Sequence, residues 1–366
     1  MCNWKYFSWI FESFESNRKK YILFLFIFLK INLKILITLI KEQFYMNNKT
    51  FRWAICGTGN ISHRFLKALS QIDDCEAVAC FSSTKERAEE YGKAHNMKPY
   101  VYTDKPDLNE FDAVYVCTNN HLHAQNVEYF INHNVPVLVE KPFAVDSAQA
   151  KKMIELATSK NVLLMEAMWT AYLPCTAAVK KLVAGQSMGE IKKVESFFTI
   201  PHLESTGHRI FKKEYAGGVI LDLGVYFISY TYQLFGAPLD IDCDIIKHRD
   251  GVELEAKITM KYAGFQAEGI CSLSVDDRTC YYNITTERGT AKIPDFNGAN
   301  KYSFELNYGK VTEHNFEPHV EQFSYQARYF MDLYKNNKKQ SDLYPLSTSQ
   351  LIVDMMTKCR AKLATL

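Results

Sequence analysis

The sequence predicts an α/β protein in which a doubly wound parallel sheet is followed by an α+β half with an open, largely antiparallel sheet. Three observations lead to this fold class. A glycine-rich turn joins a short apolar run to a helical pattern within residues 51–62. Short buried-strand runs then alternate with helical patterns as far as residue 165, which is typical of a parallel sheet. Apolar and polar residues alternate strictly over Val252–Tyr262, which indicates a half-buried antiparallel strand.

The first half is expected to contain buried strands at Phe51–Cys56, Glu76–Phe81, Ala113–Cys117, Val135–Val139 and Val162–Met165. A helix is expected over Thr84–His95, and a second helix follows a cap formed by Asp146 or Ser147. The pattern changes after Pro174, so the boundary between the two halves falls near residues 166–175.

The second half is expected to continue with strands at Phe265–Val275 and Thr279–Thr286. Apolar residues at helical spacing predict a helix over Phe323–Tyr334. Ser347 and Gln350 have the spacing of a capping box, which predicts the start of the last helix.

Composition excludes several classes of protein. The chain has 366 residues, 47% of them hydrophobic and 23% charged, as in a globular protein large enough for two cores. Its net charge of +2 and the lack of a basic, aromatic-rich patch argue against nucleic acid as a partner. The ten cysteines lack zinc-ligand spacing, so we expect reduced thiols in a cytoplasmic enzyme and no metal.

Residues 1–45 differ from the rest of the chain. Their apolar runs, Tyr21–Leu29 and Ile31–Ile40, are interrupted by Lys30 and Lys34, so a continuous span of ~18–20 apolar residues is missing. A basic surface helix, a poor membrane anchor and translated upstream DNA all fit this composition. We favour the last, with Met46 as the start of the protein.

The turn after the first strand carries the first functional signal. Gly57 permits a tight turn, and Gly59 lets the backbone approach a phosphate at the start of the next helix. This strand–turn–helix cradles a dinucleotide pyrophosphate in the Rossmann fold, so Thr58, Asn60 and Ile61 are also expected at the cofactor. Residues 46–170 are then expected to form the NAD(P)-binding domain, and residues 171–366 a second domain.

The end of the second strand bears on the choice of cofactor. An NAD enzyme usually has an acidic residue there, to bind the ribose hydroxyls. This chain instead has Ser82, Ser83 and Lys85, with Arg87 nearby. Hydroxyls and cations suit a 2′-phosphate, so we favour NADP over NAD. The alternative is that the two cations are only the solvated start of a helix.

Two further segments stand out. Glu140–Lys141–Pro142 follows a buried strand, at the sheet edge where such folds bind ligands. The segment Ala216–Tyr226 places Asp222 and Tyr226 four residues apart, on one face if the segment is helical. The alternatives are a solvated lysine at a strand end and a tyrosine packed in the core.

Together these segments resemble the Gfo/Idh/MocA oxidoreductases, and the resemblance covers Phe51–Leu366. It rests on GTGNIS at residues 57–62, CTNNHLH at 117–123, EKP at 140–142, MEAMWTAYLP at 165–174 and GGVILDLGVY at 217–226. The tyrosine at position 226, where many members have histidine, is similar to the dihydrodiol dehydrogenase and glucose–fructose oxidoreductase-like branch. Ala171 stands where that branch has arginine, so one substrate contact is expected to be missing.

The resemblance implies roles for individual residues. Lys141 and Tyr226 would be the catalytic pair, with the ammonium lowering the pKa of the phenol, and Asp222 would assist. Trp169 would line the substrate pocket, although a core tryptophan is the alternative, and Arg209 would also contact substrate. Residues implied at the cofactor are Thr118, Asn119, Asn120, His123, Glu140 and Lys141. His121 and His208 are the next candidates for the proton donor.

The function that follows is reversible hydride transfer between a nicotinamide and a hydroxyl or carbonyl carbon of a sugar, polyol or cyclic diol. The resemblance also implies that residues 171–366 form the substrate and oligomerisation domain, and that the protein is a homodimer or higher homo-oligomer. An NAD-specific inositol or sugar dehydrogenase is the same-class alternative. A catalytically silent cofactor-binding sensor and a membrane-tethered interaction protein are alternatives from other classes.

Overall fold

The computed structural model describes residues 50–102, 104, 108–185, 187–201, 207–275, 277–316 and 321–365. Residues 51–366 form one compact unit. The amino-terminal extension, with the expected start at Met46, lies outside the described residues. Within the described ranges, no helix is both long and apolar enough to cross a membrane.

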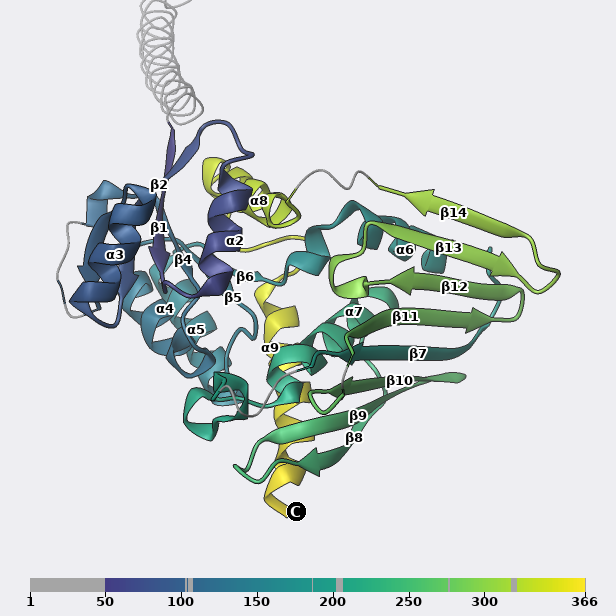
Figure 1. The fold of residues 1–366 in the computed structure, drawn as a ribbon. Helices are drawn as coiled ribbons and strands as arrows, with labels where there is room; N and C mark the ends of the chain where they lie inside the picture. Colours follow the sequence, from purple (N-terminus) through teal and green to yellow (C-terminus); the bar gives the residue numbers. More distant parts are fainter. Residues whose placement is uncertain are drawn as a thin grey trace, which may run out of the picture. The chain divides into compact units, whose positions relative to one another are not determined.

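The first sheet has the strand order β3-β2-β1-β4-β5-β6, and every adjacent pair is parallel (Figure 1). Its strands are β1 (Phe51–Cys56), β2 (Cys75–Ser82), β3 (Lys98–Val101), β4 (Ala113–Val116), β5 (Val137–Glu140) and β6 (Leu164–Ala167). This is the strand order of a doubly wound sheet. Successive strands are added on one side of β1 as far as β3, and from β4 onward they are added on its other side. The expected strands are confirmed, with β5 and β6 each beginning two residues later than predicted, whereas β3 was not anticipated.

The helices of the first half are α2 (Asn60–Leu69), α3 (Lys85–His95), α4 (His123–Asn132) and α5 (Ser147–Lys160). Asp146 caps α5, because its carboxylate accepts a hydrogen bond of 2.9 Å from the Gln149 amide. Thr84 caps α3 in the same way, so the predicted helix over Thr84–His95 is confirmed to within its cap.

The second sheet has the order β14-β13-β12-β11-β7-β10-β9-β8. Its strands are β7 (Ile191–Thr199), β8 (Asp240–Lys247), β9 (Glu253–Tyr262), β10 (Phe265–Ser272), β11 (Thr279–Thr286), β12 (Gly289–Pro294), β13 (Lys301–Leu306) and β14 (Val311–Asn315). Only the pairing of β7 with β10 is parallel among the strands described, so the predicted, largely antiparallel sheet is confirmed. Sequence patterns identified β9, β10 and β11 and missed the others.

The helices of the second half are α6 (Pro174–Ala184), α7 (Val225–Phe235), α8 (Phe323–Lys335) and α9 (Leu346–Ala361). The predicted capping box at the start of α9 is wrong. Pro345 is the N-cap, and the Leu346 amide donates to the side-chain oxygen of Gln340, which replaces a local cap. Ser347 therefore lies inside the helix, and Gln350 donates to a carbonyl oxygen of the first half instead.

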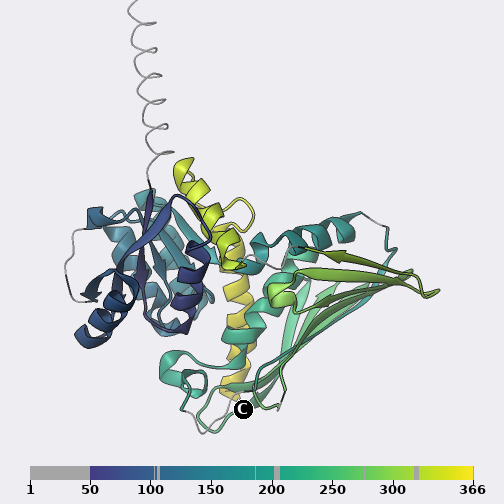
Figure 2. The ribbon, with the colours of Figure 1, turned by 45° about the horizontal axis from the view of Figure 1, so that its top comes forward.

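Helix α9 joins the two halves. It packs against α5 and β6 on one side and against α7 and β8 on the other, and Figure 2 shows it running between the two sheets. The buried apolar side chains of both halves form one continuous cluster. The nine cysteines in the described part of the chain are free thiols. Side chains at the facing edges of the two halves are therefore held against one another.

Candidate active site

The glycine turn after β1 has the geometry of a phosphate-binding loop. Gly57 has a φ of +116°, and a Cβ there would lie 2.6 Å from the Cys117 carbonyl oxygen, so only glycine fits. Gly59 is the N-cap of α2, and a Cβ there would meet no atom within 4 Å. The helix N-terminus, beginning at Asn60 and Ile61, therefore faces open space that an anion can occupy.

Ser62 stands where the motif has its third glycine, and it still allows α2 to pack closely against the sheet. It is fully buried, and its hydroxyl donates to the Gly59 carbonyl oxygen at 2.6 Å. Tyr91 of α3 in turn donates to the Ser62 hydroxyl at 2.7 Å. A small hydroxyl side chain thus keeps α2 close to the sheet and fixes the turn.

The end of β2 lies beside this turn. Ser82 is buried, and its hydroxyl lies 3.0 Å from that of Thr58, which joins the strand end to the glycine turn. Ser83, Lys85 and Arg87 are exposed at the start of α3. Lys85 has a long contact, 3.7 Å, with a glutamate one turn along the helix, and its side chain is mostly exposed. Its ammonium is therefore accessible to an anion at this helix N-terminus.

The segment after β4 is tied to the end of β5 by a buried histidine. The His123 ring nitrogens lie 3.0 Å from the Thr118 carbonyl oxygen and 2.9 Å from that of Pro142. Burial lowers the pKa of His123 to about 4, so the ring is neutral and donates to one carbonyl at a time. His123 therefore fixes the backbone, and it does not stand open to a ligand.

The same segment reaches across to the second half. The Asn120 amide donates to the Ala216 carbonyl oxygen at 3.0 Å, and Asn120 is buried. Asn119 directly precedes this contact, and the Thr118 hydroxyl accepts from Asn126 at 3.1 Å. The predicted cofactor segment thus borders the segment that leads to Asp222.

Lys141 stands at the centre of the site. It follows β5 and precedes a cis peptide bond to Pro142. Its Nζ donates to the Asp222 backbone oxygen at 3.0 Å and to the carboxylate Oδ1 at 3.2 Å. Burial by itself lowers the pKa of the Lys141 ammonium, but Asp222 and Tyr226 more than offset this, so that pKa lies above its usual value.

Arg209 shares the same carboxylate. Its Nη2 lies 3.6 Å from Asp222 Oδ1, and its Nη1 is buried without a hydrogen-bond partner within the described part of the chain. Two cations therefore meet one carboxylate here. Such a group favours an additional negative charge, such as one that develops on a substrate oxygen.

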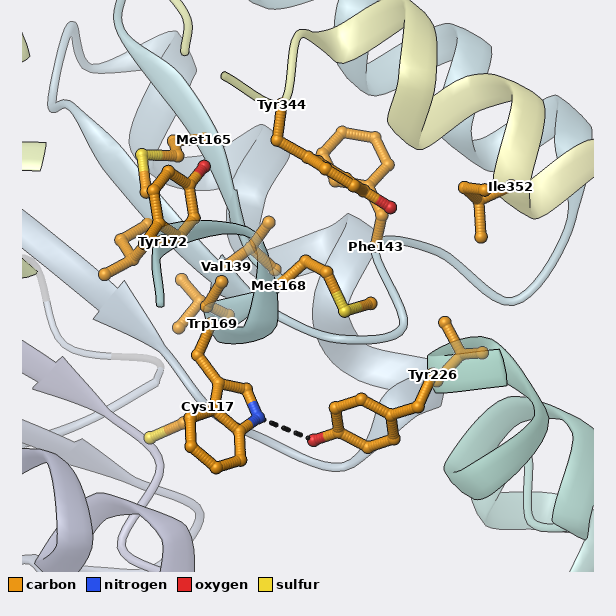
Figure 3. Packing of buried hydrophobic residues seen from close by; sticks show 14 of the residues in the cluster. Cys117, Val139, Phe143, Met165, Met168, Trp169, Tyr172, Tyr226, Tyr344 and Ile352 are labelled. Atoms are coloured by element: carbon orange, nitrogen blue, oxygen red, sulfur yellow. Dashed lines mark hydrogen bonds between the residues drawn. The ribbon is translucent and has the colours of Figure 1, made fainter. Parts of the chain in front are cut away.

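Tyr226 completes the group from the second half. The Lys141 Nζ lies 4.9 Å from the centre of the Tyr226 ring, and the Tyr226 Oη accepts a hydrogen bond of 3.0 Å from Trp169 Nε1 (Figure 3). Burial raises the pKa of Tyr226, and Lys141 offsets this only in part. The net pKa of this phenol therefore lies above its usual value, opposite to the direction expected from the sequence.

The backbone that presents Asp222 is not an ordinary α-helix. Ile220–Gly224 forms a π-helical turn that runs directly into α7. Asp222 and Tyr226 therefore do not stack at α-helical spacing, yet both contact Lys141. Such turns recur at functional sites because they re-aim side chains, and sequence periodicity cannot reveal them.

Trp169 is both buried and placed at a cavity. It is 3% exposed, with the Arg64 guanidinium 4.4 Å from its ring centre and the Phe323 ring 5.1 Å away. It borders a cavity of about 500 Å³ that is otherwise lined by Arg64, Arg278, Asp295, Asn297, Gly298, Asn300, Glu321 and Gln322. Two ion pairs, Arg64–Glu321 and Arg278–Asp295, balance the charges of this lining.

The two other candidates for the proton donor, His208 and His121, have contacts of their own. His208 accepts a hydrogen bond from the Ile210 amide and so caps a short turn. His121 packs against the Tyr215 ring, and its Nδ1 is buried without a partner among the described residues.

A larger cavity, about 920 Å³, lies between α5 and α9 and has none of the predicted site residues in its lining.

Two buried carboxyl groups support the strand ends. Glu140 Oε1 accepts from the Tyr115 hydroxyl at 2.5 Å, and burial raises the pKa of Glu140. Glu166 Oε1 accepts from the Phe143 amide at 3.1 Å, and burial raises the pKa of Glu166 to about 7. The role of Glu166 was not anticipated, because a single acid in an apolar strand has no distinguishing pattern.

Known proteins share both halves of this arrangement. Residues 51–168 match the Gfo/Idh/MocA oxidoreductase family with its NAD-binding Rossmann fold, and residues 176–292 match the Gfo/Idh/MocA C-terminal domain. A scyllo-inositol 2-dehydrogenase (NADP(+)), IolU of Bacillus subtilis, is 29% identical over 85% of this chain and 97% of its own length. A trans-1,2-dihydrobenzene-1,2-diol dehydrogenase of Danio rerio is 30% identical over 66% of this chain and 74% of its own.

A solved structure agrees in fold. KijD10, a 3-ketoreductase from Actinomadura kijaniata in complex with NADP and TDP-benzene, superposes with a TM-score of 0.77. The match covers 86% of this chain and 98% of that one at 22% identity. Together with the two family matches, these findings identify the chain as an NAD(P)-binding oxidoreductase of the Gfo/Idh/MocA family.

Proposed function

We propose that the chain transfers a hydride between NADP and a hydroxyl or carbonyl carbon of a polyhydroxylated substrate such as a sugar or cyclic polyol. The observation that carries this proposal is the meeting of Lys141, Asp222 and Tyr226, which come from the two halves of the fold. An acid, a cation and an anchoring carboxylate beside a nicotinamide-binding domain are the groups that carbonyl reduction needs.

Tyr226 is the proton donor in this proposal. Its Oη already accepts a hydrogen bond from Trp169, which leaves the phenolic proton available for a substrate oxygen. Because its pKa is raised, the phenol stays protonated at neutral pH. The bound cofactor supplies the hydride during reduction and accepts it during oxidation.

Lys141 stabilises the developing charge. An ammonium has three donors, and Asp222 takes two of them, so one remains for the substrate oxygen. Arg209 adds a second cation to the same carboxylate. Asp222 is therefore a positioning residue in this proposal, because it holds both cations and carries no proton to the substrate.

Several features support NADP as the preferred cofactor. Ser83, Lys85 and Arg87 are exposed at the start of α3. The Ser82 hydroxyl forms a hydrogen bond with that of Thr58 in the glycine turn. A 2′-phosphate would find hydroxyls, a cation and a helix N-terminus there. The name of the Bacillus relative, a dehydrogenase that uses NADP(+), agrees with this choice.

The cavity beside Trp169 supports a polyhydroxylated substrate. Its lining is mostly carboxylate, amide and guanidinium groups, which can hydrogen-bond hydroxyls, whereas an apolar ring offers them no hydrogen bond. This lining favours sugars and polyols over the aromatic dihydrodiol named for the Danio relative.

We further propose a cytoplasmic protein with a cofactor domain over 46–170, a second domain over 171–366, and assembly into homodimers or larger oligomers. The free thiols support a reducing compartment. The family resemblance supports the oligomer, which light scattering of the purified protein would measure.

A substrate screen tests the proposed function. The purified full chain is incubated with NADPH or NADH and a panel of keto-sugars, inosose and aromatic carbonyl compounds, and absorbance at the nicotinamide band is followed. We expect turnover with the polyhydroxylated members and NADPH. Cofactor binding without turnover on any member would favour a sensor instead.

A further inference from the structure

Glu253 departs from the pattern of its strand. It stands on the polar face of β9, which alternation predicts to be solvated, yet it is fully buried. Its Oε1 accepts a hydrogen bond of 2.8 Å from Arg360 Nε in the last turn of α9. Its Oε2 is buried without a hydrogen-bond partner in the part of the chain that the structure describes.

Arg360 also contacts the first half of the fold. Its Nη1 donates to the Val145 carbonyl oxygen at 3.2 Å. Val145 lies four residues after Lys141, in the segment between β5 and α5. One guanidinium thus joins the segment that carries Lys141 to the carboxylate of Glu253 in the second half.

Glu253 in turn lies against the segment that carries Asp222. A Cβ on Gly218 would lie 1.7 Å from Glu253 Oε2, so the carboxylate occupies the space that any side chain at position 218 would need. The Gly218 carbonyl oxygen accepts from the Asp222 amide at 3.3 Å. The backbone that begins at Gly218 therefore leads within four residues to the partner of Lys141.

We propose that Glu253 and Arg360 are positioning residues that hold the Lys141 and Asp222 segments in register across the two halves. This inference rests on the proposed function. Glu253 is fully buried and Arg360 is partly buried, so desolvation offsets much of their attraction and the pair adds little net stability. The geometry that the pair enforces explains its presence better. The pair touches both segments whose side chains must meet, and neither residue lies among the predicted site residues.

Turnover measurements on the full chain test this role. The variants are Arg360→Met, Arg360→Lys and Glu253→Gln. The matched control is Lys358→Met on the same helix, which breaks an exposed ion pair with Asp240. We expect Arg360→Met to lower kcat roughly 10–100-fold through misalignment, with NADPH affinity changed less than about twofold. Arg360→Lys should restore part of kcat, and the control should match the wild type.

A second readout does not depend on activity. Brief treatment with acetic anhydride, followed by mass spectrometry, measures how readily each lysine is acetylated. Because Asp222 holds the Lys141 ammonium, we expect slow labelling in the wild type and labelling at least about threefold faster in Arg360→Met and Glu253→Gln. Exposed Lys85 and Lys151 serve as internal references, and their labelling should not change.

The outcomes separate the two proposals. If the wild type has no turnover, the proposed function fails, and the labelling of Lys141 still decides the positioning role. Unchanged labelling of Lys141 in both Arg360→Met and Glu253→Gln would overturn the positioning role. The positioning role would also be overturned if a variant with faster labelling of Lys141 than the wild type kept a normal kcat. If Arg360→Met does not fold, Glu253→Gln, which keeps the shape of the side chain, carries the test.

Discussion

The residues of the site differ in how well they could be predicted from the sequence. The glycine turn, Lys141 and Tyr226 could be predicted because each stands in a short motif with a physical purpose. Glu166 and Glu253 could not, since their burial depends on segments distant in the chain. The direction of the Tyr226 pKa was also missed, because it depends on how far burial outweighs the neighbouring ammonium.

Cofactor choice is tested at Ser83. We expect Ser83→Asp to weaken NADP binding at least about tenfold, because a carboxylate beside the 2′-phosphate replaces a hydroxyl, and to strengthen NAD binding. Calorimetric titration of both cofactors measures this. Ser187→Asp adds the same charge at an exposed position in the second half and should have no effect. Unchanged binding of both NAD and NADP in Ser83→Asp would place the ribose elsewhere.

Glu166 gives a prediction about pH. Its folded pKa of about 7 lies above the usual value of 4.5, so the neutral carboxyl contributes stability at low pH that is lost as pH rises through 7. Glu166→Gln removes this dependence. Between pH 5 and 8, the free energy of unfolding of the wild type relative to this variant should fall by roughly 2–3 kcal/mol. Urea unfolding measures it.

The control for this change is Glu155→Gln on the exposed side of α5. Its relative free energy of unfolding should not depend on pH in this range. A Glu166→Gln variant whose pH profile runs parallel to that of the wild type would show that Glu166 is already ionised in the folded protein.

Among the helices and strands, those specified by a local sequence pattern were predicted best. β1 and β11 were predicted to the residue, and Thr84 and Asp146 cap their helices through short-range bonds. The start of α9 was mispredicted because Gln340, which lies outside the helix, takes the first amide. The π-helical turn at Ile220–Gly224 has no sequence period of its own, so the site's most specific backbone feature was hidden.

Gly218 allows a test of this segment. It has a φ of +109°, and a Cβ would collide with the Glu253 carboxylate, whereas Gly251 has a φ of +83° and open space around it. Both substitutions to alanine carry the cost of a left-handed backbone, about 1–2 kcal/mol. We expect Gly218→Ala to cost roughly 2 kcal/mol more, since the collision is added. Urea midpoints compare them, and equal costs would contradict the tight approach.

At the scale of the whole molecule, the site exists because two sheets meet. Lys141 directly follows a strand of the parallel sheet, and Tyr226 lies in the first turn of a helix packed on the other sheet. Helix α9 touches both halves and carries Arg360, so it fixes how they meet. The sequence suggested this meeting only through family resemblance, because no spacing along the chain encodes a contact between residues 85 positions apart.

The most direct test of the account is the rate of carbonyl reduction by NADPH in Tyr226→Phe. The control is Tyr230→Phe, which removes a buried hydroxyl one turn further along α7. If Tyr226 donates the proton beside Lys141, Tyr226→Phe lowers kcat by roughly 10²–10⁴ with NADPH affinity little changed, and the control stays near the wild type. Near-normal kcat in Tyr226→Phe across pH would contradict the account and direct the search for the donor to His121 or His208.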